Sequence, residues 1–199
     1  MKVIVSLVCV LMLSLFMAGT SGATYIVDTG TPSNGAIKWQ LSTSQCLAGQ
    51  FTLSSGENIG EMQGWIATAY SAGTMNVSIY SDASGLPGAL QFTNSFVSQP
   101  KGFSGWQGTS GYSGYLKPGT YWIAFEPVTF WGGMGTNPAN LASPLSLEAF
   151  TYQGTWNVYP SGLGLGVRIE GSPAPLPGAL LLLGPGLVGL AAVRRRFKK

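Results

Sequence analysis

The central part of the chain, residues 24–171, consists of short stretches in which apolar and polar residues alternate. Alternation is clear over Met75–Tyr80, Thr120–Glu126 and Leu163–Glu170, whereas Ser81–Gly88 is a dense cluster of turn-forming residues. No helical periodicity joins these stretches. The pattern predicts an all-β domain, namely a single antiparallel β-sandwich of jelly-roll-like arrangement.

Alternation also predicts which side chains face the core. Within Thr120–Glu126 one face is apolar, so Trp122 is expected on the opposite, outer face. Within Leu163–Glu170 the branched apolar residues are expected to point inward, and the glycines and charged residues outward. The side chains expected inside are Met75, Val77, Ile79, Tyr121, Ile123, Phe125, Leu163, Leu165, Val167 and Ile169.

The formal net charge of +3 comes from the two ends of the chain. Lys2 and the segment Arg194–Lys199 hold six of the ten basic residues. Residues 24–171 hold four basic and seven acidic residues, which gives that part a net charge of −3. It lacks the basic surface that nucleic-acid binding requires, so no nucleic-acid partner is expected.

Histidine is absent, and the two cysteines are Cys9 and Cys46. The absence of histidine excludes Ser-His-Asp catalysis and histidine metal sites. Cys9 lies in an N-terminal apolar run, so Cys46 would be alone in the domain and no disulfide within the chain is expected. A buried thiol is one interpretation of Cys46, and an intermolecular bridge is the other. We predict no catalytic residue, no metal and no cofactor.

Residues 1–23 have the three parts of a secretory signal peptide. Lys2 supplies the positive start, and an apolar stretch of 15 residues, Val3–Met17, follows. Small residues, Ser21-Gly22-Ala23, precede the expected cleavage point between Ala23 and Thr24. The apolar stretch is short for a membrane span. An uncleaved anchor is the alternative interpretation.

Residues 172–199 combine a proline-rich segment (173–178), an apolar run and a basic end. The run Leu176–Val193 has 18 residues, which as a helix would extend about 27 Å and cross most of a bilayer core. The basic residues after it are expected to stay in the cytoplasm and stop transfer. With the signal peptide, this places residues 24–171 outside the inner membrane. The stop-transfer residues are Arg194, Arg195, Arg196, Lys198 and Lys199.

This tail resembles the PEP-CTERM class of C-terminal sorting domains, and more closely its Pro-Leu-Pro variants. The resemblance rests on Pro175-Leu176-Pro177-Gly178, the apolar helix after it and the basic end, about 26 residues in that order. Leu176 stands where the commonest motif has Glu. A permanent C-terminal anchor without processing is the alternative.

The resemblance implies a Gram-negative host that makes extracellular polysaccharide. It also implies two processing partners, signal peptidase and an exosortase-type membrane protease that cuts near the proline motif. The protein would pass through an inner-membrane intermediate to the cell surface or the extracellular space. Pro175, Leu176, Pro177 and Gly178 would then be substrate residues of the exosortase.

The domain resembles β-sandwich domains of exported bacterial proteins that carry varied anchors. The segments concerned are Gln50–Leu53, Val77–Asp82 with Gly85–Gly88, and Leu116–Trp122. The resemblance implies no particular activity. Ser81–Gly88 is explained by turn chemistry, because Asp accepts hydrogen bonds from nearby amides and Gly adopts unusual dihedral angles.

Two function classes besides a structural role have candidate residues. A glycan hydrolase would need two facing carboxylates, and Glu57 with Glu61 or Glu126 with Glu148 are the candidate pairs. A carbohydrate-binding module would use aromatic rings that stack on sugar faces. Its predicted contact residues are Trp106 and Tyr112, in a Gly-rich loop-like segment, and Trp122.

The sequence thus predicts an exported cell-surface or extracellular-matrix protein that is sorted by its tail. We expect the domain to be non-catalytic, with a structural or adhesive role. Binding of exopolysaccharide is the alternative function, and glycan hydrolysis is the third.

Overall fold

The computed structural model describes residues 24–32, 38–110, 114–135 and 144–173. The regular structure in these residues is entirely β-strand, and none of them forms a helix that could cross a membrane. The predicted signal peptide (1–23) and the predicted membrane helix (176–193) lie outside the described residues.

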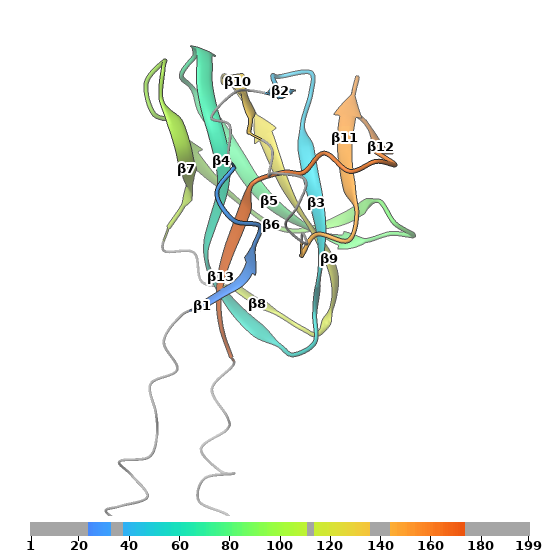
Figure 1. The fold of residues 1–199 in the computed structure, drawn as a ribbon. Coiled ribbons are helices and arrows are strands. Elements are labelled where there is room, and N and C mark those ends of the chain that lie inside the picture. The colour runs from blue at the N-terminus through green and yellow to red at the C-terminus, as the bar shows by residue number, and fades with distance from the viewer. Residues whose placement is uncertain (1–23, 33–37, 111–113, 136–143, 174–199) are drawn as a thin grey trace, which may run out of the picture. The chain divides into compact units, whose positions relative to one another are not determined.

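The described strands form two antiparallel sheets (Figure 1). In the seven-stranded sheet the order is β1-β13-β4-β10-β2, and β7 and β8 also pair with β4. Its strands are β1 (Thr24–Asp28), β2 (Trp39–Leu41), β4 (Glu57–Ser71), β7 (Ser104–Thr109), β8 (Gly114–Leu116), β10 (Trp131–Met134) and β13 (Val167–Pro173).

In the six-stranded sheet the order is β12-β11-β3-β9-β5-β6. Its central strand β3 is almost completely buried, and its neighbour β9 is buried from Trp122 to Phe125. Its strands are β3 (Leu47–Leu53), β5 (Thr74–Asp82), β6 (Pro87–Val97), β9 (Gly119–Pro127), β11 (Glu148–Tyr152) and β12 (Thr155–Val158).

One apolar core takes side chains from both sheets. Met62 and Ile66 of β4 and Ile123 and Phe125 of β9 belong to it and are fully buried. Gly64 of β4 allows the sheets to approach closely, because a Cβ atom there would lie 2.7 Å from the Phe125 ring. Burial of each large side chain of this kind stabilises the fold by about 1.5–3 kcal/mol. We call the sheet face turned away from this core the outer face.

Most of the alternation predicted from the sequence is confirmed. Met75–Tyr80 lies within β5 and Thr120–Glu126 within β9, with the predicted apolar residues turned toward the core. The prediction of a continuous strand over Leu163–Glu170 is wrong in its first half, since β13 begins at Val167. Leu163 and Leu165 are buried as predicted, but they belong to a loop.

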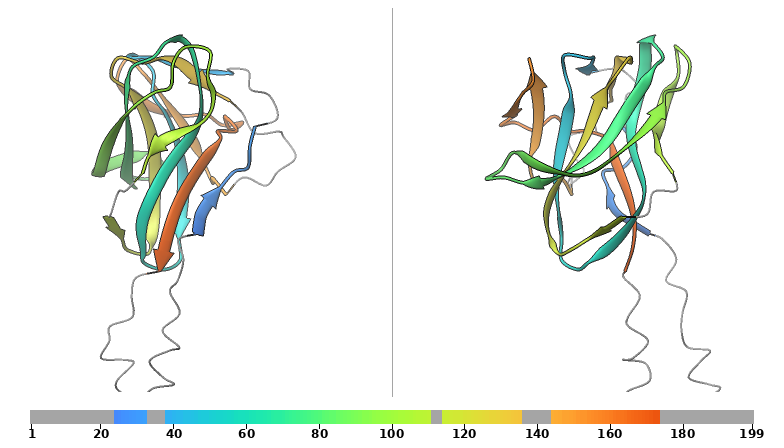
Figure 2. Two further views of the ribbon diagram at one scale, coloured as in Figure 1. Left: turned by 90° about the vertical axis from the view of Figure 1, so that its left-hand side faces the viewer. Right: turned by 180° about the vertical axis from the view of Figure 1, so that it is seen from behind.

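The start of β1 and the end of β13 lie at the same end of the domain (Figure 2). Thr24 pairs with Gly171, and Pro173 pairs with Glu57, the first residue of β4. The opposite end of β4 is Ser71, fifteen residues along the strand, a distance of roughly 45–50 Å for an extended chain. The loops at the Ser71 end are therefore the ones farthest from the two ends of the domain.

Candidate ligand-contact surfaces

Arg168 of β13 lies between two aromatic rings on the outer face of the seven-stranded sheet. Its guanidinium carbon is 4.1 Å from the centroid of the Trp106 ring and 5.1 Å from that of the Tyr25 ring. Trp106 also meets the edge of Trp65, with 5.4 Å between centroids and an interplanar angle of 89°. These contacts join β1, β13, β4 and β7 across one face. Cation–π contacts of this kind contribute about 0.5–2 kcal/mol.

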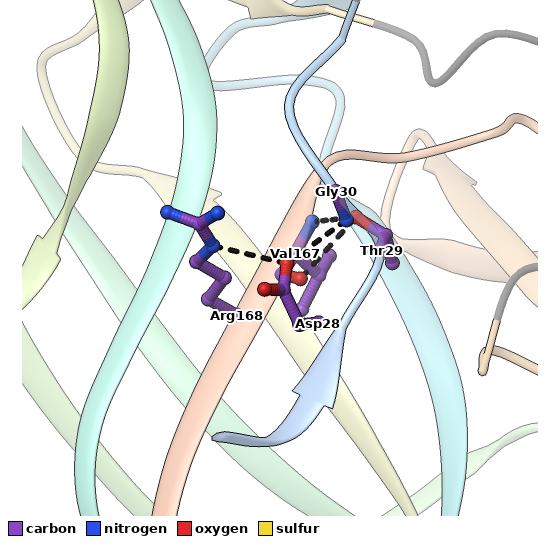
Figure 3. A network of polar contacts seen from close by, with 5 residues as sticks. All are labelled: Asp28, Thr29, Gly30, Val167 and Arg168. Atoms are coloured by element: carbon purple, nitrogen blue, oxygen red, sulfur yellow. Dashed lines mark hydrogen bonds and ion pairs between the residues drawn. The ribbon is translucent and has the colours of Figure 1, made fainter. Parts of the chain in front are cut away.

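Asp28 fixes the orientation of Arg168 (Figure 3). Its Oδ1 accepts hydrogen bonds from Arg168 Nε at 3.0 Å and from the Gly30 amide at 2.9 Å. Beside this pair, the Val167 amide donates to Thr29 Oγ1 at 2.7 Å. The guanidinium consequently covers one face of Trp106. The predicted contact residue Trp106 is on an outer face, but its ring is only partly accessible.

A second aromatic cluster lies at the far end of β4. The ring of Tyr70 stacks on that of Trp131, with 4.6 Å between centroids and an interplanar angle of 29°. The two residues are 54% and 47% exposed, although large rings are normally among the more buried side chains. Val97, at the end of β6, and Val128 and Phe103, on the neighbouring loops, are also exposed. We call this set, Tyr70, Val97, Phe103, Val128 and Trp131, the apical patch.

Backbone and side-chain hydrogen bonds hold the loops of the apical patch together. The Thr74 amide donates to Thr129 Oγ1, and the Gly73 amide donates to Ser98 Oγ. Gly73 is needed for close approach, because a Cβ atom there would lie 2.6 Å from the backbone of Thr129. A surface fixed in this way loses little conformational entropy when it binds. Lys101 is the one charged residue within loops 71–74, 97–103 and 127–131.

The prediction of Trp122 as a contact residue for a glycan is wrong. It lies on the face of β9 opposite Ile123, as predicted, but it is fully buried there in a smaller apolar cluster with Ala48, Ala124 and Ala149. Its Nε1 donates to Asp82 Oδ1 at 2.9 Å. The ring therefore has no surface with which to contact a glycan, and its role in this structure is packing.

Asp82 connects this cluster to the β5–β6 turn. Besides Trp122, its carboxylate accepts from Gln50 Nε2 at 2.6 Å and from the Gly85 amide at 3.2 Å. The hydrogen bond from Trp122 is the largest cause of a lowered pKa for Asp82, because these donors favour the ionised form. The turn chemistry predicted for Asp82 is thus present, together with a role in packing that the sequence did not indicate.

Other predicted site residues lie outside the described residues. They are Tyr112, Ala23, the sorting motif Pro175, Leu176, Pro177 and Gly178, and the basic residues Arg194, Arg195, Arg196, Lys198 and Lys199. Thr24, the expected mature N-terminus, is the first residue of β1.

The carboxylate pairs considered for a hydrolase point to opposite sides of their sheets. Glu126 lies on the outer face, where it accepts from Tyr80 at 2.6 Å and from Ser78 at 2.5 Å. Glu148 precedes the outward-facing Ala149 and lies on the inner side. Likewise, Glu57 alternates with core residue Ile59, whereas Glu61 bonds to Gln63 on the outer face. Neither pair has the facing geometry that glycoside hydrolysis uses.

Glu148, the first residue of β11, instead holds in place a loop that the sequence did not predict. Its buried carboxylate accepts hydrogen bonds from three consecutive amides, those of Leu163, Gly164 (2.7 Å) and Leu165 (2.7 Å). Gly162 and Gly164 have φ angles of 71° and 66°, values that residues with a Cβ rarely adopt. The loop thus turns its amides toward Glu148 and cannot continue β13 toward its N-terminal side.

Cys46 is a free thiol of intermediate exposure. Burial is the largest cause of a raised pKa for this thiol, so it is less reactive than an exposed cysteine. Within the part of the chain that the structure describes, no group of three His, Cys, Asp or Glu side chains is placed to hold a metal ion.

A small apolar hollow lies between Trp39, Leu47, Phe150 and Tyr159. Its volume is about 80 Å³, and the edge of Trp39 packs on Tyr159 with 4.9 Å between centroids. Ligand sites for drug-sized molecules are several times larger, at about 300–1,000 Å³.

Comparison with known proteins gives no relative for this chain. No family model, no curated protein and no solved structure matches it. Function must therefore be argued from the chain's own surfaces. Tyr70, Arg168 and Tyr25 were not predicted as contact residues, because only the strand pairing brings them together with residues far away along the chain.

Proposed function

We propose that this protein is an exported, non-catalytic component of the bacterial cell surface or extracellular matrix, with a structural or adhesive role. Its domain is a jelly-roll-like β-sandwich, delivered by the signal peptide and the exosortase-type sorting tail. The observation that carries the proposal is the pairing of Thr24 with Gly171. The first and last described strands thus bring Thr24 and Pro173 to one end of the domain, and the apical patch lies at the other end.

Removal of the tail tests the sorting part of this proposal. A chain that ends at Pro173 keeps the compact unit Ala23–Pro173 but lacks the residues that would hold it in the membrane. We expect this variant to appear in the culture medium without passing through the membrane fraction, whereas the full chain appears first in that fraction. Immunoblots of pulse-labelled cell fractions measure the difference. Equal membrane association of both chains would contradict the proposal.

The apical patch favours binding of polysaccharide as the second candidate function. Its stacked rings offer apolar faces that suit the C–H faces of sugars. Lys101 is the single charged residue of the surrounding loops, which suits a neutral ligand better than a strongly ionic one. The exposed rings of Tyr70 and Trp131 replace Trp122 as the predicted contacts.

Retention on immobilised host exopolysaccharide tests the second candidate. We expect Trp131→Ala and Tyr70→Ala each to reduce retention of the domain about tenfold or more, because each removes an aromatic stacking surface and a tenfold loss corresponds to about 1.4 kcal/mol of binding free energy. Tyr152→Ala is the matched control, since Tyr152 is an exposed ring on β11. No retention of the wild type, or equal retention of all variants, would eliminate this function.

A further inference from the structure

The six-stranded sheet has an open edge at β6. Among the described strands β6 pairs only with β5, and the hairpin that they form reaches one margin of the domain (Figures 1 and 2). The ladder is irregular near the turn, where the register shifts at Tyr80. From Phe92 to Val97 it is regular, and each residue pairs in turn with Ile79 to Thr74. This regular part can accept another strand.

The edge lacks the charges that normally prevent association between sheets. From Ala83 to Pro100 the sequence contains no Asp, Glu, Lys or Arg, whereas natural edge strands commonly carry Lys or inward-pointing charges. Phe92 and Phe96 pack against the core but remain half-exposed. The inner side of the edge therefore presents two aromatic rings with Asn94 between them, and the edge is uncharged throughout.

The sequence of the regular part is a chemical palindrome. Phe92-Thr93-Asn94-Ser95-Phe96 reads as aromatic, hydroxyl, amide, hydroxyl, aromatic in both directions. Two copies placed antiparallel about a two-fold axis at Asn94 put Phe92 of each copy opposite Phe96 of the other. The same register puts Thr93 opposite Ser95. Aromatic pairs and hydroxyl pairs across strands each stabilise a sheet by about 0.2–1 kcal/mol.

The side chain of Asn94 hydrogen-bonds to the backbone of the edge in the single chain. Its Oδ1 accepts a hydrogen bond from the Ser95 amide at 2.9 Å, so this amide points away from the ladder with β5. In a paired edge a carbonyl of the second copy would take that place. The two Asn94 side chains would then meet at the two-fold axis, where a pair of amides can hydrogen-bond to each other and fix the register.

We infer that β6 is a self-association site at which a second copy of this chain pairs antiparallel about Asn94. The product is a closed dimer with one continuous sheet, because a two-fold contact uses the same strand of both copies. The Ala23–Pro173 chain is suited to testing this, because it is one compact unit with its own core.

Sedimentation equilibrium at high micromolar concentration measures the mass of this chain. We expect twice the mass of a single chain for the wild type. Thr93→Lys/Ser95→Lys and Thr93→Glu/Ser95→Glu should each give single-chain mass, because position 93 of each copy faces position 95 of the other with like charge. An equimolar mixture of the two variants should recover twice the single-chain mass, because every facing pair then has opposite charges. This recovery also shows that both variants are folded.

Thr155→Lys/Asn157→Lys is the matched control. It places the same two charges at exposed positions of β12, the opposite edge of the same sheet, and should leave the dimer intact. A wild type of single-chain mass, a mass above two chains, or a dimer that survives the Thr93 and Ser95 lysines would overturn the inference. So would a mixture that stays monomeric. None of these outcomes bears on export or sorting.

Discussion

Replacement of Trp122 by alanine is expected to reduce the free energy of unfolding of the domain by about 3–5 kcal/mol. Trp122 is among the largest fully buried side chains of the described residues, and its Nε1 donates to Asp82. The variant loses the buried ring, leaves a cavity and removes the donor that most strongly lowers the pKa of Asp82. Because domains are stable by only about 5–15 kcal/mol, the change would be large. Urea unfolding followed by fluorescence measures it.

Two variants separate the causes of this loss. Trp122→Phe keeps an aromatic ring but has no N–H, so it should cost less than Trp122→Ala. Tyr152→Ala removes an exposed ring and should change stability by no more than about 0.5 kcal/mol. If Trp122→Ala reduced the free energy of unfolding as little as Tyr152→Ala does, Trp122 would not be a buried packing residue.

Glu148→Ala is expected to reduce the free energy of unfolding by about 3 kcal/mol or more. Three amides, those of Leu163, Gly164 and Leu165, donate to its carboxylate. The hydrogen bonds from Leu163 and Leu165 are buried and that from Gly164 is partly buried, and each buried donor left without a partner costs about 1–3 kcal/mol. In this variant the loop that contains these three amides should open more readily than the rest of the domain. Hydrogen exchange should show the protection of these three amides falling more than that of the β9 amides.

Glu170→Ala is the control for this second prediction. Glu170 is a partly exposed carboxylate on β13, so its removal should have little effect on stability. Unchanged exchange at Leu163, Gly164 and Leu165 in Glu148→Ala would show that the carboxylate does not hold the loop.

The periodicity of the sequence predicted the elements whose structure is set locally. Met75–Tyr80 and Thr120–Glu126 are strands with the predicted faces because alternation places their apolar residues on one side of the chain. Leu163 and Leu165 were correctly predicted to be buried for the same reason. These two residues are nevertheless not part of a strand. Their amides donate to Glu148, 15 residues earlier in the sequence, and are not available for the hydrogen bonds of a β-ladder.

The contact surfaces were beyond prediction from periodicity, because neighbouring strands create them. Trp122 is covered by elements distant in the sequence, including Tyr80 of β5 and Trp156 of β12. Tyr70 and Trp131 form a stack only because β10 pairs with the end of β4. The palindrome at Phe92–Phe96 is visible in the sequence. It can support the pairing of two copies only because β6 is an edge strand.

The position of the two ends of the domain, Thr24 and Pro173, gives the proposed sorting route a physical rationale. Cleavage between Ala23 and Thr24 and near Pro175–Gly178 would remove six of the ten basic residues. The released domain would carry a net charge of −3 over residues 24–171. Its apical patch would remain at the end away from both cleavage points.

The most direct test of the proposed role as an exported, tail-sorted protein is the intact mass of the protein recovered from the cell surface and the medium. Mass spectrometry of both termini should find Thr24 as the first residue and a C-terminus within or near Pro173–Gly178, with residues Arg194–Lys199 absent. Surface protein that retains Arg194–Lys199, or that still begins at Met1, would contradict the account.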